Sequence, residues 1–184
     1  FWGTMTYGYF IGRWHFQTTH MEYVHKDIPK EFDGFKIVHI SDLHLGTFDD
    51  CPQKLEKVVA EINSQDPDIV CVTGDMVTIG KEEAEPYKET LKGIRSRHGV
   101  LSVLGNHDFL IYGFPHGEKR ENALEDLVRF HTDSLGWTLL RNENITIESN
   151  DSSRITFIGV DNTNCSSQGF KTISRGDLKK AMEG

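Results

Sequence analysis

Side chains of types that bind metal ions follow three short apolar runs of this 184-residue sequence. The first run leads into Asp42 and His44, the second into Asp75, and the third into Asn106 and His107. Such runs are typical of buried parallel strands, and ligands of open α/β sheets bind beyond the carboxyl ends of these strands. We therefore expect the five side chains to converge at one edge of a sheet.

The donor atoms of these residues suit a site for two metal ions. Carboxylate and imidazole together favour Zn, Fe or Mn over Ca, which prefers oxygen ligands alone. Asp42 and His44 are two residues apart, so an extended chain directs both toward one shared ion. Asp75 can bridge two ions through its two oxygens, and Asn106 offers an amide oxygen to the second ion. Two ions about 3.5–4 Å apart clamp the attacking and leaving oxygens of a phosphoryl displacement, which is the chemistry that this pattern predicts.

The turn after the third run also offers a proton donor. His107 follows Asn106 directly and could protonate a leaving oxygen, with Asp108 orienting its imidazole. Gly74 and Gly105 are predicted to let the backbone approach the metals closely.

Each motif also has an interpretation without metal. An Asp-x-His after a strand is common, and Gly-Asp pairs often form turns or helix caps. Their occurrence in order, each behind a buried strand, favours the metal site. The other histidines carry less weight: His39 and His131 are expected in the core, and His116 is expected not to contact a substrate. Four more are expected at the surface: His15, His20, His25 and His98.

Hydrophobic periodicity predicts alternating strands and helices. The expected strands cover residues 21–25, 35–41, 68–73, 100–104, 137–140, 145–148 and 154–160. The expected helices cover residues 52–66, 82–97, about 124–136 and 174–182. The first half therefore predicts a parallel sheet with helical crossovers, and the last three strands predict a meander that starts a second sheet.

Composition excludes several classes of protein. A net charge of −8 and a pI near 5.6 argue against a protein that wraps nucleic acid through a basic face. Cys51, Cys71 and Cys165 are too few and too scattered for a disulfide framework or a cysteine zinc site. No run of 18 apolar residues occurs, so the chain itself is expected to be soluble.

The N-terminal residues 1–18 form an arm rich in Phe, Trp and Tyr, ahead of one domain at 19–184. The arm either packs on the domain or on a neighbouring molecule, or it lies close to a membrane, because Trp and Tyr favour the bilayer interface.

Three motifs resemble, in order, the first three of the calcineurin-like metallophosphoesterases: Asp42-x-His44, Gly74-Asp75 and Gly105-Asn106-His107-Asp108. Residues 28–46 are similar to the bacterial membrane-associated branch that includes phosphodiesterases and UDP-2,3-diacylglucosamine pyrophosphatases. The resemblance implies a four-layer α/β/β/α sandwich. It also implies attack by a metal-bridging hydroxide, with His107 as the acid.

The same resemblance assigns ligands to each ion and shows that some of the family's ligands have no counterpart in this sequence. It gives Asp42, His44 and Asp75 to one ion, and Asp75 with Asn106 to the other; the metal stays open among Mn, Fe, Zn and Mg. The family adds three later histidines, whereas no histidine follows His131 here. We therefore expect a sandwich incomplete at its C-terminus, with the second sheet only partly present and one ion or fewer per chain. The missing ligands would leave the chain with weak or no activity. The incomplete sheet would leave an open edge that could pair with another copy.

The expected substrate is a phosphodiester or pyrophosphate, such as a sugar-lipid or a nucleotide. The aromatic arm favours a parent protein that is associated with a membrane. Two alternatives remain: a non-catalytic binding module that retains the fold, and a phosphomonoesterase or protein phosphatase with the same metal motifs.

Overall fold

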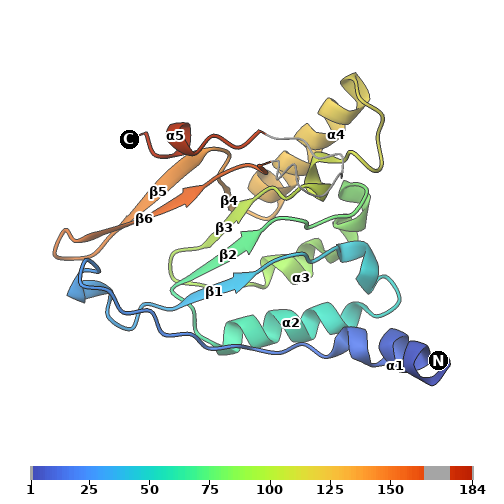
Figure 1. The fold of residues 1–184 in the computed structure, drawn as a ribbon, viewed down its shortest axis with the longest axis horizontal. Coiled ribbons are helices and arrows are strands. Elements are labelled where there is room, and N and C mark those ends of the chain that lie inside the picture. The colour runs from blue at the N-terminus through green and yellow to red at the C-terminus, as the bar shows by residue number, and fades with distance from the viewer. Residues whose placement is uncertain (1, 164–174, 184) are drawn as a thin grey trace.

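The computed structural model describes residues 2–163 and 175–183 and has the predicted α/β fold (Figure 1). Its larger sheet is parallel, with its strands in the order β1-β2-β3-β4. The strands are β1 (Ile37–Ile40), β2 (Ile69–Thr73), β3 (Val100–Val103) and β4 (Thr138–Leu139). Because all four run in the same direction, the loops that follow them leave from one edge of the sheet.

Helices cover one face of this sheet. They are α2 (Pro52–Ser64), α3 (Lys88–Lys92) and α4 (Glu118–Arg129), which continues into a π-helical turn (Phe130–Ser134). Helix α2 begins at a proline in its first turn and buries Leu55, Val59 and Ile62 against Val70 and Val72 of β2. Each such side chain stabilises the fold by about 1.5–3 kcal/mol relative to exposure.

A hairpin covers part of the opposite face. Strands β5 (Glu143–Glu148) and β6 (Arg154–Gly159) pair antiparallel, and Ile147 packs in one cluster with Ile69 and Leu101 of the parallel sheet. The short helix α5 (Leu178–Ala181) lies beside β5, where Asn144 Nδ2 donates to the Ala181 carbonyl at 2.8 Å. Helices, sheet and hairpin thus follow in the predicted order, and the second sheet has two strands in the part of the chain described.

Several predicted elements are wrong. Residues 21–25 form no strand, since no neighbouring strand pairs with them and Met21 is almost fully exposed. Pro86 divides the expected helix at 82–97 into two 3-10 turns and the short α3. The run at 137–140 belongs to the first sheet, because β4 pairs parallel to β3 with Leu139 opposite Ser102. The predicted start of the last helix, like Cys165, lies outside the described residues.

The arm has structure that the sequence did not predict. Residues Trp2–Phe10 form helix α1, whose side chains are all exposed, and a 3-10 turn follows at Gly12–Trp14. Beyond it, Thr18 Oγ1 donates to Glu61 of α2 at 2.8 Å, which fixes this end of the arm to the domain. None of the helices in the described residues is long and apolar enough to cross a membrane.

Two histidines of the sheet region differ in burial. His131 is buried as predicted, with Nδ1 at 3.0 Å from Ser102 Oγ and no hydrogen-bond partner for Nε2 among the described residues. His39 was predicted in the core but is exposed, because no element in the described part of the chain covers its side chain on β1.

Acidification is expected to destabilise the protein through His131. Burial lowers its pKa from 6.5 to about 4, so between these values only the unfolded state takes up the proton. The contribution of the neutral imidazole is complete above pH 6.5 and decreases toward pH 4, by about 2 kcal/mol at pH 5. Urea unfolding at pH 6.5 and at pH 5 measures this change. The loss of unfolding free energy between the two pH values should be smaller in His131→Gln than in the exposed control His98→Gln. Equal losses of unfolding free energy in the two variants would show that His131 is not the group that destabilises the protein in acid.

Candidate metal centre

Backbone hydrogen bonds bring the loops after β1, β2 and β3 together. The amide of Asp42 donates to the Gly74 carbonyl at 3.1 Å, and the amide of His44 donates to the Asp75 carbonyl at 3.0 Å. The amide of His107 donates to Asp75 Oδ1 at 2.9 Å. The Asp75 loop therefore lies between the other two and holds both.

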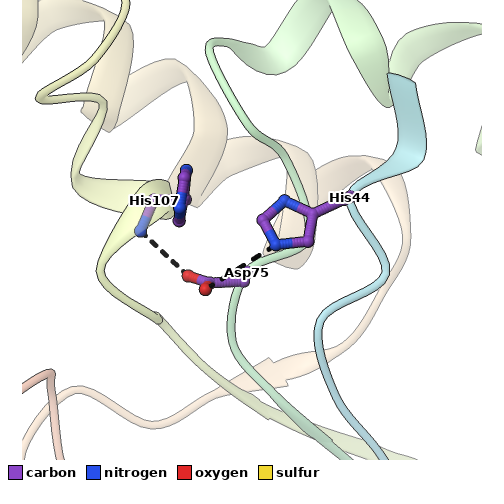
Figure 2. A group of neighbouring side chains, drawn as sticks. All are labelled: His44, Asp75 and His107. Atoms are coloured by element: carbon purple, nitrogen blue, oxygen red, sulfur yellow. Dashed lines mark hydrogen bonds and ion pairs between the residues drawn. The ribbon is translucent and has the colours of Figure 1, made fainter. Parts of the chain in front are cut away.

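Three of the side chains singled out in the sequence form a cluster at this edge (Figure 2). His44, Asp75 and His107 each offer one donor atom, and these atoms lie within 4.8 Å of one another. His44 Nε2 lies 3.9 Å from Asp75 Oδ2, and the two imidazole rings stand perpendicular with centroids 4.8 Å apart. Two nitrogens and a carboxylate that is only 8% exposed match the donor set preferred by Zn, Fe or Mn, so the cluster fits a divalent ion.

Thr78 orients both imidazoles, a role that no feature of the sequence indicates. Its carbonyl lies 3.2 Å from His107 Nδ1, and because a carbonyl only accepts, Nδ1 carries the proton and Nε2 is free. Its hydroxyl lies 3.1 Å from His44 Nδ1, which leaves His44 Nε2 directed at Asp75. Tyr112, also unanticipated, stacks on the His107 ring at 4.5 Å.

Glu83 fixes the loop that carries Thr78. Its carboxylate accepts hydrogen bonds from the amides of Thr78 and Ile79 at 2.9 and 2.7 Å, and from Gly46 at 3.3 Å. The sequence places Glu83 within a charged surface stretch with no spacing that marks it. Only its hydrogen bonds to these amides in the folded structure distinguish it from the neighbouring acidic residues.

Removing the Thr78 hydroxyl is expected to weaken metal binding by about 10–100-fold, because partners that orient a ligand usually contribute this much. Thr78→Val keeps the size of the side chain and the carbonyl that His107 uses. Titration with Co²⁺, followed by its absorption spectrum, measures the affinity. Thr132→Val, at an exposed threonine in the π-helical turn after α4, serves as the control. Equal affinities for the two variants would remove Thr78 from the site.

The backbone of the site is strained at the candidate ligands. Asp42, His44 and Asp75 have φ values of 54°, 40° and 52°, in the left-handed region that few residues other than glycine adopt. Gly105 is required for a different reason than predicted: a Cβ there would collide with the carboxylate and amide of Asp75. Glycine thus lets two loops approach each other. Strain of this kind costs about 1–3 kcal/mol per residue and is concentrated at functional sites.

Asp108 does not lie where the sequence predicted. Its fully buried carboxylate accepts hydrogen bonds from the amides of Val77 and Gly105, at 3.2 and 2.9 Å, whereas the Thr78 carbonyl orients His107. Burial raises the pKa of Asp108 to about 7, although these amides oppose the shift. Asp108 therefore joins the second and third loops as a structural residue.

The remaining predicted ligands, Asp42 and Asn106, are neighbours in sequence of residues in the cluster. Asp42 is exposed and accepts a hydrogen bond from Ser41 Oγ at 2.5 Å; among the described residues it is not part of the group formed by His44, Asp75 and His107. Asn106 is half-buried and directly precedes the 3-10 turn that carries His107.

The chain is similar to known proteins over most of its length. The family model described as "Calcineurin-like phosphoesterase" matches residues 35–178. An uncharacterized metallophosphoesterase of Campylobacter jejuni is 30% identical over 131 residues, which are 71% of this chain and 32% of that protein. The UDP-2,3-diacylglucosamine pyrophosphatase LpxG of Chlamydia trachomatis is 41% identical over 91 residues, which are 47% of this chain and 27% of LpxG.

A third relative, a transmembrane protein with a metallophosphoesterase domain from Bos taurus, is 29% identical over 166 residues, 88% of this chain. These residues are 34% of the bovine protein. The chain thus spans about a third or less of the length of these relatives.

Proposed function

This chain belongs to the calcineurin-like phosphoesterase family, and from this premise we propose that its three converging loops carry the metal-binding half of a phosphodiester or pyrophosphate hydrolase. The observation that supports the proposal best is the cluster of His44, Asp75 and His107 at the carboxyl edge of the parallel sheet. It places a carboxylate and two imidazoles where ligands of open α/β sheets bind.

The residues divide into ligands and a proton donor. His44 and Asp75 would hold the first ion together with Asp42, and Asn106 would join Asp75 as a ligand of the second. A divalent ion supplies positive charge that polarises a phosphoryl oxygen and lowers the pKa of water. Because Nδ1 of His107 donates to the Thr78 carbonyl, Nε2 is the atom that would take up a second proton and, as imidazolium, pass it to the leaving oxygen.

We also propose a membrane setting for the parent protein. Helix α1 has no charged residue and exposes Trp2, Tyr7 and Phe10, side chains that favour the bilayer interface. Similarity to LpxG, whose name gives a sugar-lipid pyrophosphate as its substrate, agrees with a lipid-linked phosphate ester. The N-terminal arm would then hold the site close to its substrate.

The test combines cleavage and binding. We expect slow, Mn²⁺-dependent cleavage of bis-p-nitrophenyl phosphate that is lost in His107→Asn and retained in His116→Asn, an exposed histidine outside the cluster. Independently of turnover, Mn²⁺-loaded protein should broaden the phosphorus NMR signal of inorganic phosphate more than Asp75→Asn protein does. Cleavage unaffected by chelator, or equal broadening by both proteins, would overturn the proposal.

A further inference from the structure

A cavity of about 400 Å³ lies between the arm and the domain, and its lining includes Asp42, two residues before His44 of the candidate metal centre. The arm contributes Arg13, Trp14 and Phe16 to its wall. Apolar side chains of β1, of the segment after it and of α2 form most of the rest, and Ser41, Asp42 and Thr47 are polar members of the wall. The volume lies within the range of sites that bind small molecules, roughly 300–1,000 Å³.

We propose that this arm cavity binds an alkyl or acyl chain attached to the phosphate group that is held at the metal centre. The inference rests on the proposed function, because Asp42 belongs both to the cavity wall and to the predicted ligands. One molecule can therefore place its phosphate at the loops and its chain among the aromatic side chains. The arm then selects the substrate as part of the binding site.

The wall that the arm provides is fixed by contacts with the domain. The rings of Trp14 and Phe16 lie 5.5 and 6.3 Å from that of Phe48, which is only 4% exposed. The hydrogen bond from Thr18 to Glu61 anchors the following residues to α2. A preformed apolar cavity binds a chain without the cost of ordering its own walls.

The chemistry of the wall favours an anionic amphiphile. Apolar carbon moved from water into such a cavity gains about fourfold in affinity per methylene when burial is complete. The Arg13 guanidinium, held 4.4 Å from the ring centroids of Tyr9 and Trp14 and 3.8 Å from Asp50, adds a cation to the wall. A chain that ends in a phosphate satisfies both features.

Isothermal titration of the Mn²⁺-loaded chain with octyl phosphate, below its micelle concentration, and with inorganic phosphate tests the proposal. We expect octyl phosphate to bind at least about tenfold more tightly. Thr47→Trp fills the cavity from an exposed position and should remove this difference while leaving inorganic phosphate binding unchanged. Glu56→Trp, on an exposed part of α2 outside the cavity, should retain it.

The outcomes separate the two proposals. Equal affinity for the two phosphates, or an advantage of octyl phosphate that survives Thr47→Trp, overturns the arm cavity. An advantage that Thr47→Trp removes but that does not require Mn²⁺ supports the cavity and contradicts the metal centre as the holder of the phosphate. An advantage that requires both the cavity and Mn²⁺ supports both.

Discussion

Asp75→Asn is expected to weaken Mn²⁺ binding by at least about 100-fold, more than the loss of an orienting partner causes. Asp75 is the buried carboxylate between two imidazoles and the predicted bridge between two ions. The amide that replaces it has no charge and only one oxygen. That oxygen can still accept the hydrogen bond from the His107 amide, so the fold should persist.

Asp66→Asn is a matched control for this variant. Asp66 has a φ of 49°, close to the 52° of Asp75, but it lies beyond the C-terminal end of α2 and pairs with Arg97. Asparagine tolerates this backbone region, so both variants should unfold near the wild-type temperature. Competition with a chelating dye measures the affinity. Retention of wild-type affinity by Asp75→Asn would contradict the assignment of Asp75 as a ligand.

Asp108→Ala is expected to lower the free energy of unfolding by about 3 kcal/mol, because it leaves two buried amides without an acceptor and opens a small cavity. These amides belong to Val77 and Gly105, on the two loops that carry Asp75 and His107. We therefore expect the Asp108→Ala variant to bind metal more weakly as well as to be less stable. Asp108→Asn, which retains one acceptor oxygen, should show an intermediate loss.

Urea denaturation of the chain measures this effect, with Asp126→Ala as the control. Asp126 lies on an exposed part of α4 in a long ion pair with Arg129, so its loss should change stability by less than about 0.5 kcal/mol. A loss of similar size in both variants would show that Asp108 does not join the loops.

The parallel half of the fold could be predicted because its strands are short, continuous apolar runs that end at polar loops. The run at 69–73 and the helix after Pro52 are examples in which the buried residues set the pattern directly. The strand at 138–139 is too short to indicate its partner, and its parallel pairing with β3 is seen only in the structure. Helix α1 could not be predicted, because its residues have no face that packs.

For the candidate site, residue types indicated the edge of the sheet but not the arrangement there. His44, Asp75 and His107 converge because they follow three neighbouring parallel strands; the alternation of elements predicts that the strands are parallel, and the structure supplies their order. The role of Thr78 could not be predicted, since its carbonyl and hydroxyl act only through the path of its loop. The position of Asp108 was misjudged because proximity in sequence to His107 does not fix the direction of a carboxylate.

Metal content per chain tests the central claim most directly. After equilibrium dialysis against excess Mn²⁺, elemental analysis of the wild-type chain is expected to give about one ion per chain, and the Asp75→Asn chain close to none. This ratio follows because three proposed ligands, Asp42, His44 and Asp75, serve the first ion, whereas only Asp75 and Asn106 are left for a second. A wild-type chain that retains no Mn²⁺, or equal content in the two proteins, would contradict a metal centre at this edge of the sheet.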